Sequence, residues 1–487
     1  MSAAEVRVRF APSPTGFLHV GGLRTALYNF LFARKNNGKF ILRIEDTDRA
    51  RYVEGAVENL IATLKWSGLE YDEGPVIGGN CGPYIQSERT DIYKWHVDKL
   101  IENKSAYRCF CTPERLESMR KDMEKRKLTP KYDRTCLRLS EKEIQDNLSA
   151  GKTFVVRMRV PDDTVVKFSD EIRGSVEFKS EQIDDQVLIK SDGYPTYHLA
   201  NVVDDHLMKI SHVIRGEEWL SSTPKHVLLY GFFGWTLPVF AHLPLLLNPD
   251  RSKLSKRQGD VAVEDYMKKG YLKEALVNFI ALLGWNPGDD REIFMLDELE
   301  NEFSLEKVNK AGAVFNLEKL NWLNFKHLRL KPDTEVLEML KSEITKSDFK
   351  SNEYTDEYLL EVIVVMRERV SFVRDFIEKS PYFFGPPASY DPAVVKKRWN
   401  KESSKYLDVL INEFMSLANP AREDFERALH RVAESLGVNN GELIHPLRLA
   451  VSGMGEGPGL FDILKVIGKN EVIKRMKLAV DTIVPVA

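Results

Sequence analysis

Residues 6–44 read VRVRFAPSPTGFLHVGGLRTALYNFLFARKNNGKFILRI, and this stretch decides the fold. It begins with a short alternating segment, residues 6–10, which predicts a strand. A loop rich in Pro, Gly and Ser follows over 11–22, and apolar residues recur at helical spacing over 23–34. After an Asn-Asn-Gly turn, residues 40–44 predict a second strand. A strand, a helix and a strand in this order are the usual opening of a Rossmann-type α/β sheet.

The rest of the chain divides into segments of different pattern. Residues 91–196 combine a charged helical pattern over 114–127 with a strand-like segment over 154–160, which indicates an insert. Strands and helices with strong apolar runs resume at residue 197. From about residue 264 the pattern is nearly all helical, as in 272–283, 357–376 and 422–436. We therefore expect an α/β Rossmann-type domain split by an α+β insert and followed by an all-α C-terminal half. The expected boundaries are 1–90 and 197–250 for the Rossmann-type domain, 91–196 for the insert, and 251–330, 331–402 and 403–487 for the remainder.

Composition bounds the class of protein. The 487 residues exceed what one hydrophobic core usually supports, and 43% apolar with 29% charged residues is typical of folded, soluble chains. The longest apolar runs fall well short of the roughly 20 residues that a membrane span needs. The first residues lack a signal or transit pattern and the cysteines are few, so we expect a cytoplasmic protein with no membrane segment. A net charge of −3 gives no hint of nucleic acid, although phosphate binding depends on local basic clusters.

Two loops have the composition of phosphate-binding sites. The first, PSPTGFLHVGG at 12–22, lies between the predicted strand and helix, where glycines allow close backbone approach and a helix start offers N–H groups to an anion. In it, His19 can donate a hydrogen bond to a phosphate oxygen. The second, KLSKR at 253–257, gathers three cations and a hydroxyl that can clamp a triphosphate. Each loop taken singly has an ordinary alternative: a Gly/Pro loop that packs a helix onto a sheet, and a solvated basic loop.

As a pair, the two loops resemble the ATP signatures of the class I aminoacyl-tRNA synthetases. Three further stretches are similar to the glutamyl branch of that class: RIEDTD at 43–48, KSDGYPTYHLANVVDDH at 190–206 and VIRGEEW at 213–219. The likeness covers the whole chain, which resembles the bacterial-type glutamyl-tRNA synthetases. Its all-helical tail separates it from the eukaryotic and archaeal branches, whose anticodon domains are β-barrels.

The resemblance implies a two-step reaction. The α-carboxylate of glutamate attacks the α-phosphorus of ATP and releases pyrophosphate, and the 3′-terminal adenosine of tRNA(Glu) then takes the glutamyl group as AMP leaves. This class works by positioning and electrostatics without a covalent enzyme intermediate. ATP brings Mg²⁺, which keeps several waters and binds phosphate oxygens. The catalytic residues implied are His19, Gly21, Lys253 and Lys256.

Glutamate carries two carboxylates and one ammonium, so its pocket needs arginine forks and an acid. The resemblance implies that Glu45 holds the ammonium and that Arg215 holds the side-chain carboxylate, with Arg9 and Tyr197 assisting. An arginine at that point also rejects glutamine. Without the resemblance, an exposed strand-end carboxylate and a surface salt bridge are the simpler interpretations of Glu45 and Arg215. The implied pocket consists of Arg9, Ala11, Ser13, Glu45, Tyr197, Asn201 and Arg215.

The family likeness also assigns contacts to ATP and tRNA. Trp219 is expected near the acceptor end of the tRNA, and Asp204 and Asp205 either join it or cap a helix. In the tail, three arginines match positions that read the anticodon, whose unpaired bases are recognised by stacking and edge hydrogen bonds. They are Arg367, Arg369 and Arg448. The implied ATP contacts are Pro12, Thr15, Gly16, His19, Gly21, Gly22, Glu218, Lys253, Ser255, Lys256 and Arg257.

By the same likeness, residues 91–196 bind the acceptor arm and 251–330 form a stem-contact region with the KLSKR loop. Residues 331–402 and 403–487 are two helical anticodon-binding subdomains, and the protein is a monomer. Basic residues over 120–138 can meet acceptor-stem phosphates, or they form a solvated helix face.

A set of thiols lies in the insert. Cys109 and Cys111 are followed by Cys136, and three thiolates can hold Zn²⁺ as part of a tetrahedral set. Some family members carry a structural zinc here, with a fourth ligand close to the third cysteine, where this chain has Arg138 in place of a histidine. Tyr132 is the remaining candidate for that ligand. Three small buried thiols without metal are the alternative.

Several other functions compete with the main interpretation. The same enzyme with broader tRNA choice would charge tRNA(Gln) as well. A non-catalytic tRNA-binding paralogue should have lost His19, Lys256 or the pocket arginines, and all are present. A relative that modifies a tRNA base should lack the tail after Phe315, and an unrelated nucleotidyltransferase should be much shorter and lack RIEDTD.

Overall fold

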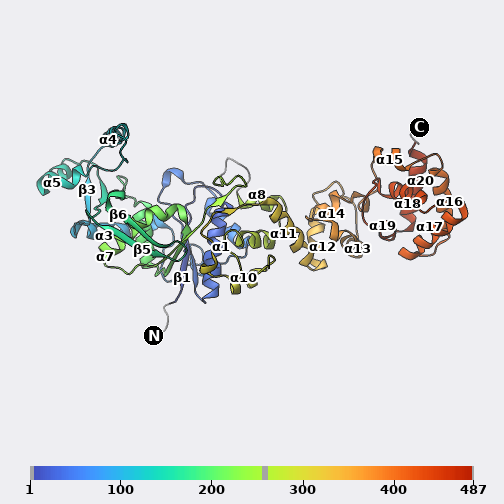
Figure 1. The fold of residues 1–487 in the computed structure, drawn as a ribbon, viewed down its shortest axis with the longest axis horizontal. Helices are drawn as coiled ribbons and strands as arrows, with labels where there is room; N and C mark the ends of the chain where they lie inside the picture. Colours follow the sequence, from blue (N-terminus) through green and yellow to red (C-terminus); the bar gives the residue numbers. More distant parts are fainter. Residues whose placement is uncertain (1–4, 255–261, 485–487) are drawn as a thin grey trace. The chain divides into compact units, whose positions relative to one another are not determined.

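The computed structural model describes residues 5–254 and 262–484. The chain forms two compact units, one of residues 1–269 and 273–320 and the other of residues 270–272 and 321–487. In the described residues, all strands lie in the first unit, and the second is built of helices (Figure 1). This division into α/β and all-α parts is the predicted fold class.

The first unit opens with the predicted strand, helix and strand. Strand β1 (Arg7–Phe10) pairs in parallel with β2 (Lys39–Leu42), and helix α1 (Val20–Lys35) connects them. The helix begins three residues earlier than the apolar spacing predicted, because the His19 side chain accepts a hydrogen bond from Gly22 N and caps it there. The loop that follows β1 is thereby tied to the amino end of α1.

The sheet continues with strands from far along the sequence. Strands β8 (His212–Gly216) and β9 (Val239–Leu243) pair in parallel, with α6 (Tyr197–Leu207) before β8 and α7 (Thr223–Phe233) between the two. Ser211 N donates to Arg7 O at 2.9 Å, which sets the start of β8 beside β1. The carboxyl ends of β1 and β8 therefore lie at one edge, where ligands of open α/β sheets bind.

The insert builds a sheet of its own and also extends the catalytic sheet. Its antiparallel sheet consists of β3 (Ala106–Cys109), β4 (Val155–Met158) and β7 (Val187–Ile189), so the strand predicted over 154–160 is present. The hairpin of β5 (Val165–Asp170) and β6 (Gly174–Lys179) instead joins the catalytic strands in the order β6-β5-β9-β8. Asp170 pairs with Phe240 of β9 and so brings part of the insert into the catalytic sheet. The helices of the segment are α3 (Thr90–Glu102), α4 (Pro113–Lys125) and α5 (Glu141–Ser149).

The remaining elements of the first unit surround these sheets. Strand β10 (Leu246–Leu247) pairs in parallel with β11 (Ala313–Val314), and α11 (Leu317–Leu330) contains the boundary between the units. The helices are α2 (Ala56–Trp66), α8 (Val263–Lys268), α9 (Lys273–Ala281) and α10 (Leu296–Glu302).

The described part of the second unit is helical throughout, as the pattern predicted. Helix α17 has the predicted bounds, but the single helix predicted over 357–376 is wrong. The chain leaves α13 at Met366, becomes extended at Val370, and turns into α14, where Asp375 accepts hydrogen bonds from Ser371 N at 2.8 Å and Phe372 N at 3.1 Å. These bonds satisfy backbone groups that a continuous helix would pair internally. The helices are α12 (Asp333–Ile344), α13 (Asp356–Met366), α14 (Asp375–Glu378), α15 (Pro392–Arg398), α16 (Ser403–Ser416), α17 (Arg422–Leu436), α18 (Gly441–Ser452), α19 (Leu460–Ile467) and α20 (Lys469–Thr482).

Candidate functional site

A cleft opens in the first unit where the carboxyl ends of β1 and β8 meet the amino end of α1. Its volume is about 890 Å³, which suits small-molecule ligands. Trp219 lies in its wall, whereas Ser255, Lys256 and Arg257 fall outside the described residues. Every described residue that was predicted for glutamate or ATP lines the cleft: Arg9, Ala11, Pro12, Ser13, Thr15, Gly16, His19, Gly21, Gly22, Glu45, Tyr197, Asn201, Arg215, Glu218 and Lys253.

The amino end of α1 faces this cleft with His19 as its cap. Gly22 N donates to His19 Nδ1 at 3.2 Å, so the neutral ring carries its proton on Nε2. A Cβ at position 22 would lie 2.7 Å from Leu18 Cδ1, so any larger residue there would force the Leu18 side chain to move. The first-turn N–H groups and the positive end of the helix dipole give this corner an affinity for phosphate.

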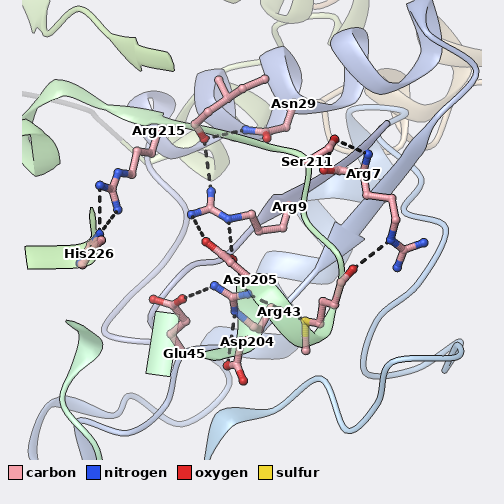
Figure 2. A network of polar contacts seen from close by, with 12 residues as sticks. Arg7, Arg9, Asn29, Arg43, Glu45, Asp204, Asp205, Ser211, Arg215 and His226 are labelled. Atoms are coloured by element: carbon pink, nitrogen blue, oxygen red, sulfur yellow. Dashed lines mark hydrogen bonds and ion pairs between the residues drawn. The ribbon is translucent and has the colours of Figure 1, made fainter. Parts of the chain in front are cut away.

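A buried ionic network forms another wall (Figure 2). Arg43 donates to Glu45 Oε1 at 2.9 Å and to Asp205 Oδ1 at 2.7 Å, and Arg9 Nε donates to Asp205 Oδ1 at 3.0 Å. Burial raises the pKa of Glu45, against the opposing effect of Arg43. Burial would also raise the pKa of Asp205, but Arg9 and Arg43 outweigh it and hold that pKa below its ordinary value. Asp205 therefore locks both arginines, and Arg43 fixes the Glu45 carboxylate at the cleft.

The two acids of α6 do not have the predicted roles. Neither Asp204 nor Asp205 lines the cleft, and the caps of α6 are Thr196 and Met208. Asp204 instead accepts hydrogen bonds from Arg89 Nε at 2.7 Å and from Tyr93 and Gln86. Both residues lie in the last turn of α6, and their buried carboxylates fix the framework behind the cleft.

Arg215 ends β8 as a buried cation with neutral partners. It is 5% exposed, which excludes a surface salt bridge, and Glu45, equally buried, is no exposed strand-end carboxylate. Arg215 Nη1 donates to Tyr197 OH at 2.9 Å, and Nη2 donates to Thr223 Oγ1 at 3.0 Å. Its remaining described contacts are with ring nitrogens of His226 and His242, and no described carboxylate forms an ion pair with it. A buried guanidinium without a counter-charge is a strong site for an anion.

Two neighbours on α6 complete this corner. Asn201 is 2% exposed, and its Nδ2 lacks a hydrogen-bond partner among the described residues. The ring of Tyr197 lies 4.1 Å from that of Trp219, centroid to centroid. A buried amide with an unused donor, next to an aromatic wall, fits a polar ligand. Thr223, His226 and His242 were not predicted, since no motif of the sequence singles them out.

Four side chains of the insert converge as the zinc prediction requires. The Sγ atoms of Cys109, Cys111 and Cys136 lie within 4.8 Å of one another, and Tyr132 OH lies 3.3 Å from the Sγ atoms of Cys109 and Cys111. Hydrogen bonds, first of all that with Cys136, lower the pKa of Cys109 well below its ordinary value, and the same contact raises the pKa of Cys136. Zn–S bonds of ≈2.3 Å in a tetrahedron separate sulfurs by roughly 3.8 Å. The 3.5 Å between Cys111 and Cys136 is close to that spacing.

Some of the basic residues predicted to meet acceptor-stem phosphates have acidic partners. Lys121 pairs with Glu117 and Arg126 with Asp122, both one helical turn away. These pairs favour the interpretation of α4 as a solvated helix face.

The three arginines predicted for the anticodon differ in their surroundings. Arg367 pairs with Asp333 and donates to Leu328 O at 3.2 Å, so it connects helices of the second unit. Arg448 donates to Pro458 O at 2.9 Å. Burial, and then repulsion by Arg369, lower the pKa of Arg448. Arg369 and Arg448 thus lie close enough for their charges to repel each other.

Comparison with known proteins defines the class. The family described as "tRNA synthetases class I (E and Q), catalytic domain" matches residues 5–322, and "Anticodon binding domain" matches residues 335–480. The chain is therefore a class I aminoacyl-tRNA synthetase of the glutamate and glutamine branch, with a Rossmann-type catalytic domain followed by an all-helical anticodon domain.

Full-length relatives define the family within that class. The chain is 55% identical to the glutamate–tRNA ligase of Chloroherpeton thalassium and 53% identical to that of Chlorobium chlorochromatii, over 99% of each pair of chains. A solved glutamate tRNA ligase from Elizabethkingia meningosepticum, in complex with its amino acid, matches with a TM-score of 0.94 and 41% identity over 99% of this chain and 100% of that one. This chain belongs to the glutamate–tRNA ligase family. No helix among its described residues has the length and apolar character for a membrane span.

Proposed function

We propose that the cleft activates L-glutamate with ATP and transfers the glutamyl group to the 3′-terminal adenosine of tRNA(Glu), releasing pyrophosphate and AMP. The observation that carries this proposal is the neutral environment of the buried Arg215, in a cleft that Glu45 also lines. Glutamate supplies a side-chain carboxylate for the first residue and an ammonium for the second. Glutamine would leave the buried guanidinium without a counter-charge, so the site discriminates against it.

The other pocket residues bind the amino-acid backbone and close the pocket. Ser13 and the unused Nδ2 of Asn201 suit the α-carboxylate, and Tyr197 supports Arg215 through its hydroxyl. Arg9 adds positive potential at the wall of the cleft, although its ion pair with Asp205 restricts the movement of its side chain toward the ligand. Ala11 leaves space at the carboxyl end of β1.

ATP binds at the amino end of α1. His19 and the N–H groups around Gly21 and Gly22 contact phosphate oxygens, with Pro12, Thr15 and Gly16 shaping the loop, and Glu218 lies near the nucleotide. Lys253 and Lys256 stabilise the charge that develops on the α-phosphoryl group, with Ser255 and Arg257 beside them. Mg²⁺ accompanies the triphosphate through its own oxygens and water.

The tRNA contacts are proposed along the domain division predicted above. Residues 91–196 and Trp219 meet the acceptor end, 251–330 the stem, and 331–402 with 403–487 the anticodon. The charge gathered at Arg369 and Arg448 supports the anticodon role of these two residues more than that of Arg367, which has Asp333 as partner. The protein acts as a monomer in the cytoplasm, where its free thiols stay reduced.

The thiol cluster of the insert would hold a structural zinc ion. Cys109, Cys111, Cys136 and Tyr132 are the ligands, and Arg115, whose Nη1 lies 3.3 Å from Cys111 Sγ, offsets part of the thiolate charge. When bound, the ion would tie β3 to the turn that carries Tyr132 and Cys136, and its role would be structural and not catalytic.

The test is aminoacylation with labelled glutamate and ATP, run separately on purified tRNA(Glu) and tRNA(Gln), together with ATP–pyrophosphate exchange with and without tRNA. Charging of tRNA(Glu) alone is the expected result and describes a discriminating enzyme. Charging of both keeps the reaction but assigns a broader tRNA choice. Charging of neither by folded protein would refute the proposal and leave a non-catalytic paralogue.

A further inference from the structure

A chain of buried hydrogen bonds supports Arg215 from the side opposite to the pocket. His242 Nε2 lies 3.1 Å from Arg215 Nε, and His242 Nδ1 lies 2.6 Å from Asp170 Oδ2. The side chains of His242 and Asp170 are fully inaccessible, and neither residue lines the cleft. Asp170 ends β5, His242 lies on β9 and Arg215 on β8, so three adjacent strands of one sheet contribute one residue each.

Asp170 determines which group donates and which accepts in each of these hydrogen bonds. Burial would raise its pKa, but hydrogen bonds from His242 and from Arg173 N at 2.8 Å hold the pKa below its ordinary value. An ionised carboxylate only accepts, so the proton of the ring lies on Nδ1. Burial also lowers the pKa of His242, which stays neutral and offers the lone pair of Nε2 to Arg215.

We propose that Asp170 and His242 are positioning residues for glutamate recognition. The carboxylate sets the tautomer of the imidazole, the imidazole fixes Nε of Arg215, and the guanidinium is thereby held ready for the side-chain carboxylate. A long, flexible arginine binds more tightly when it is held in its binding conformation beforehand. This inference rests on the proposed function, in which Arg215 binds glutamate.

The turn of the β5–β6 hairpin is anchored so that Asp170 stays in place. Asp170 Oδ1 accepts from Ile172 N at 3.0 Å, and Arg173 Nε donates to His242 O at 3.2 Å. Arg173 Nη2 also forms an ion pair with Glu217 at 2.5 Å. A segment of the insert therefore supports the specificity arginine, although it lies more than 40 residues before it in the sequence.

The test compares three variants in tRNA-dependent ATP–pyrophosphate exchange at saturating ATP. His242→Gln can place an amide oxygen where Nε2 lies, and we expect its KM for glutamate within about three-fold of wild type. His242→Asn reaches only the Nδ1 position, and Asp170→Asn allows the ring proton to move to Nε2, where it opposes the N–H of Arg215. For both, we expect KM for glutamate to rise ten-fold or more, with KM for ATP unchanged and the glutamate-to-glutamine preference reduced by the same factor.

Two further measurements separate positioning from folding. His212→Gln, a histidine of β8 that contacts Ser211 and not Arg215, is the matched control and should leave KM unchanged. In protein labelled with ¹⁵N-histidine, the ring signal that disappears in His242→Gln should be of the Nδ1–H form, and an Nε2–H form of that ring would overturn the proposal. An active wild type with unchanged KM in both His242→Asn and Asp170→Asn would refute the positioning role alone. A wild type that fails to activate glutamate would refute the proposed function itself.

Discussion

Arg43 Nη2 holds Oε1 of Glu45 at 2.9 Å, and both side chains are buried beside the cleft. Because Arg43 is also bound to Asp205, its charge is shared between two carboxylates, and Glu45 retains negative potential for a ligand. A neutral amide at position 45 would still fill the space. The pair therefore predicts that charge at residue 45 matters for binding more than for folding.

Glu45→Gln should raise KM for glutamate about 10–100-fold, because a hydrogen bond to a charged group contributes roughly 1.5–3 kcal/mol. KM for ATP should stay within two-fold. Steady-state charging of tRNA(Glu) measures both. Glu73→Gln is the control: that acid pairs with Arg7 at 2.8 Å outside the cleft, so its loss should lower the melting temperature and leave KM unchanged. Equal KM values for glutamate in the two variants would show that Glu45 does not bind the glutamate ammonium.

Arg215→Ala should weaken glutamate binding at least 100-fold, since it removes the buried cation that meets the side-chain carboxylate. Arg215→Lys should recover little of this loss, because an ammonium cannot replace the separate contacts to Tyr197 and Thr223. Equilibrium binding of glutamate, measured by calorimetry, gives the comparison. A glutamate affinity unchanged in Arg215→Ala would exclude the residue from recognition.

The sequence predicted the residues of the cleft because they lie in short motifs at the ends of strands. The loop over 11–22 carries most of them, and Arg215 lies at the carboxyl end of β8. The family resemblance assigned these residues to the site, and the carboxyl edge of a parallel sheet is where such residues meet. Residues that support the site through space were missed. His242 and Asp170 read as ordinary strand residues, and their contact with Arg215 depends on strand order, which no local pattern encodes. The break between α13 and α14 was missed for a different reason. The Asp375 side chain accepts a hydrogen bond from Ser371 N and so replaces a helical backbone hydrogen bond, which the apolar spacing does not reveal.

Lys256→Ala should lower the rate of glutamate activation at least 100-fold while glutamate affinity changes less than three-fold. Its contact should strengthen as charge develops on the α-phosphoryl group, so the loss falls on the chemical step. Rapid-quench measurement of adenylate formation separates the rate from the affinity. Lys269→Ala, which replaces a lysine outside the cleft lining, is the matched control. An unchanged activation rate would rule out the proposed role of Lys256.

Removal of zinc should destabilise the insert and leave adenylate formation intact. Wild-type protein should contain one zinc per chain by atomic emission, and Cys111→Ser should contain less than a fifth of that. Tyr132→Phe should bind zinc more weakly, because its hydroxyl is the fourth group of the set. Cys81→Ser, at a thiol outside the cluster, should keep the full content. Equal zinc content in Cys81→Ser and Cys111→Ser would contradict the ligand set.

Stability of the catalytic unit should fall as the pH drops below about 6.5, because two buried histidines beside Arg215 stay neutral in the folded state. Burial is the first cause that lowers the pKa of His226 and of His242, and the positive charge of Arg215 adds to it. The unfolded chain protonates both near the ordinary pKa of about 6.5, so it binds more protons than the folded chain below that pH. The stabilisation is therefore complete above pH 6.5 and is lost on acidification, by up to about 1.4 kcal/mol per pH unit for each histidine.

Scanning calorimetry at pH 7.5 and 5.5 measures this loss, and the transition of the catalytic unit is the one that glutamate and ATP shift upward. His226→Asn cannot protonate, so its transition should drop by roughly 2–4 °C less than that of wild type between the two pH values. His430→Asn replaces an exposed histidine of the second unit and should follow wild type. If His226→Asn lost as much stability on acidification as wild type, the protons taken up on unfolding would bind at other residues. That result would contradict a neutral His226 ring that accepts a hydrogen bond from Arg215.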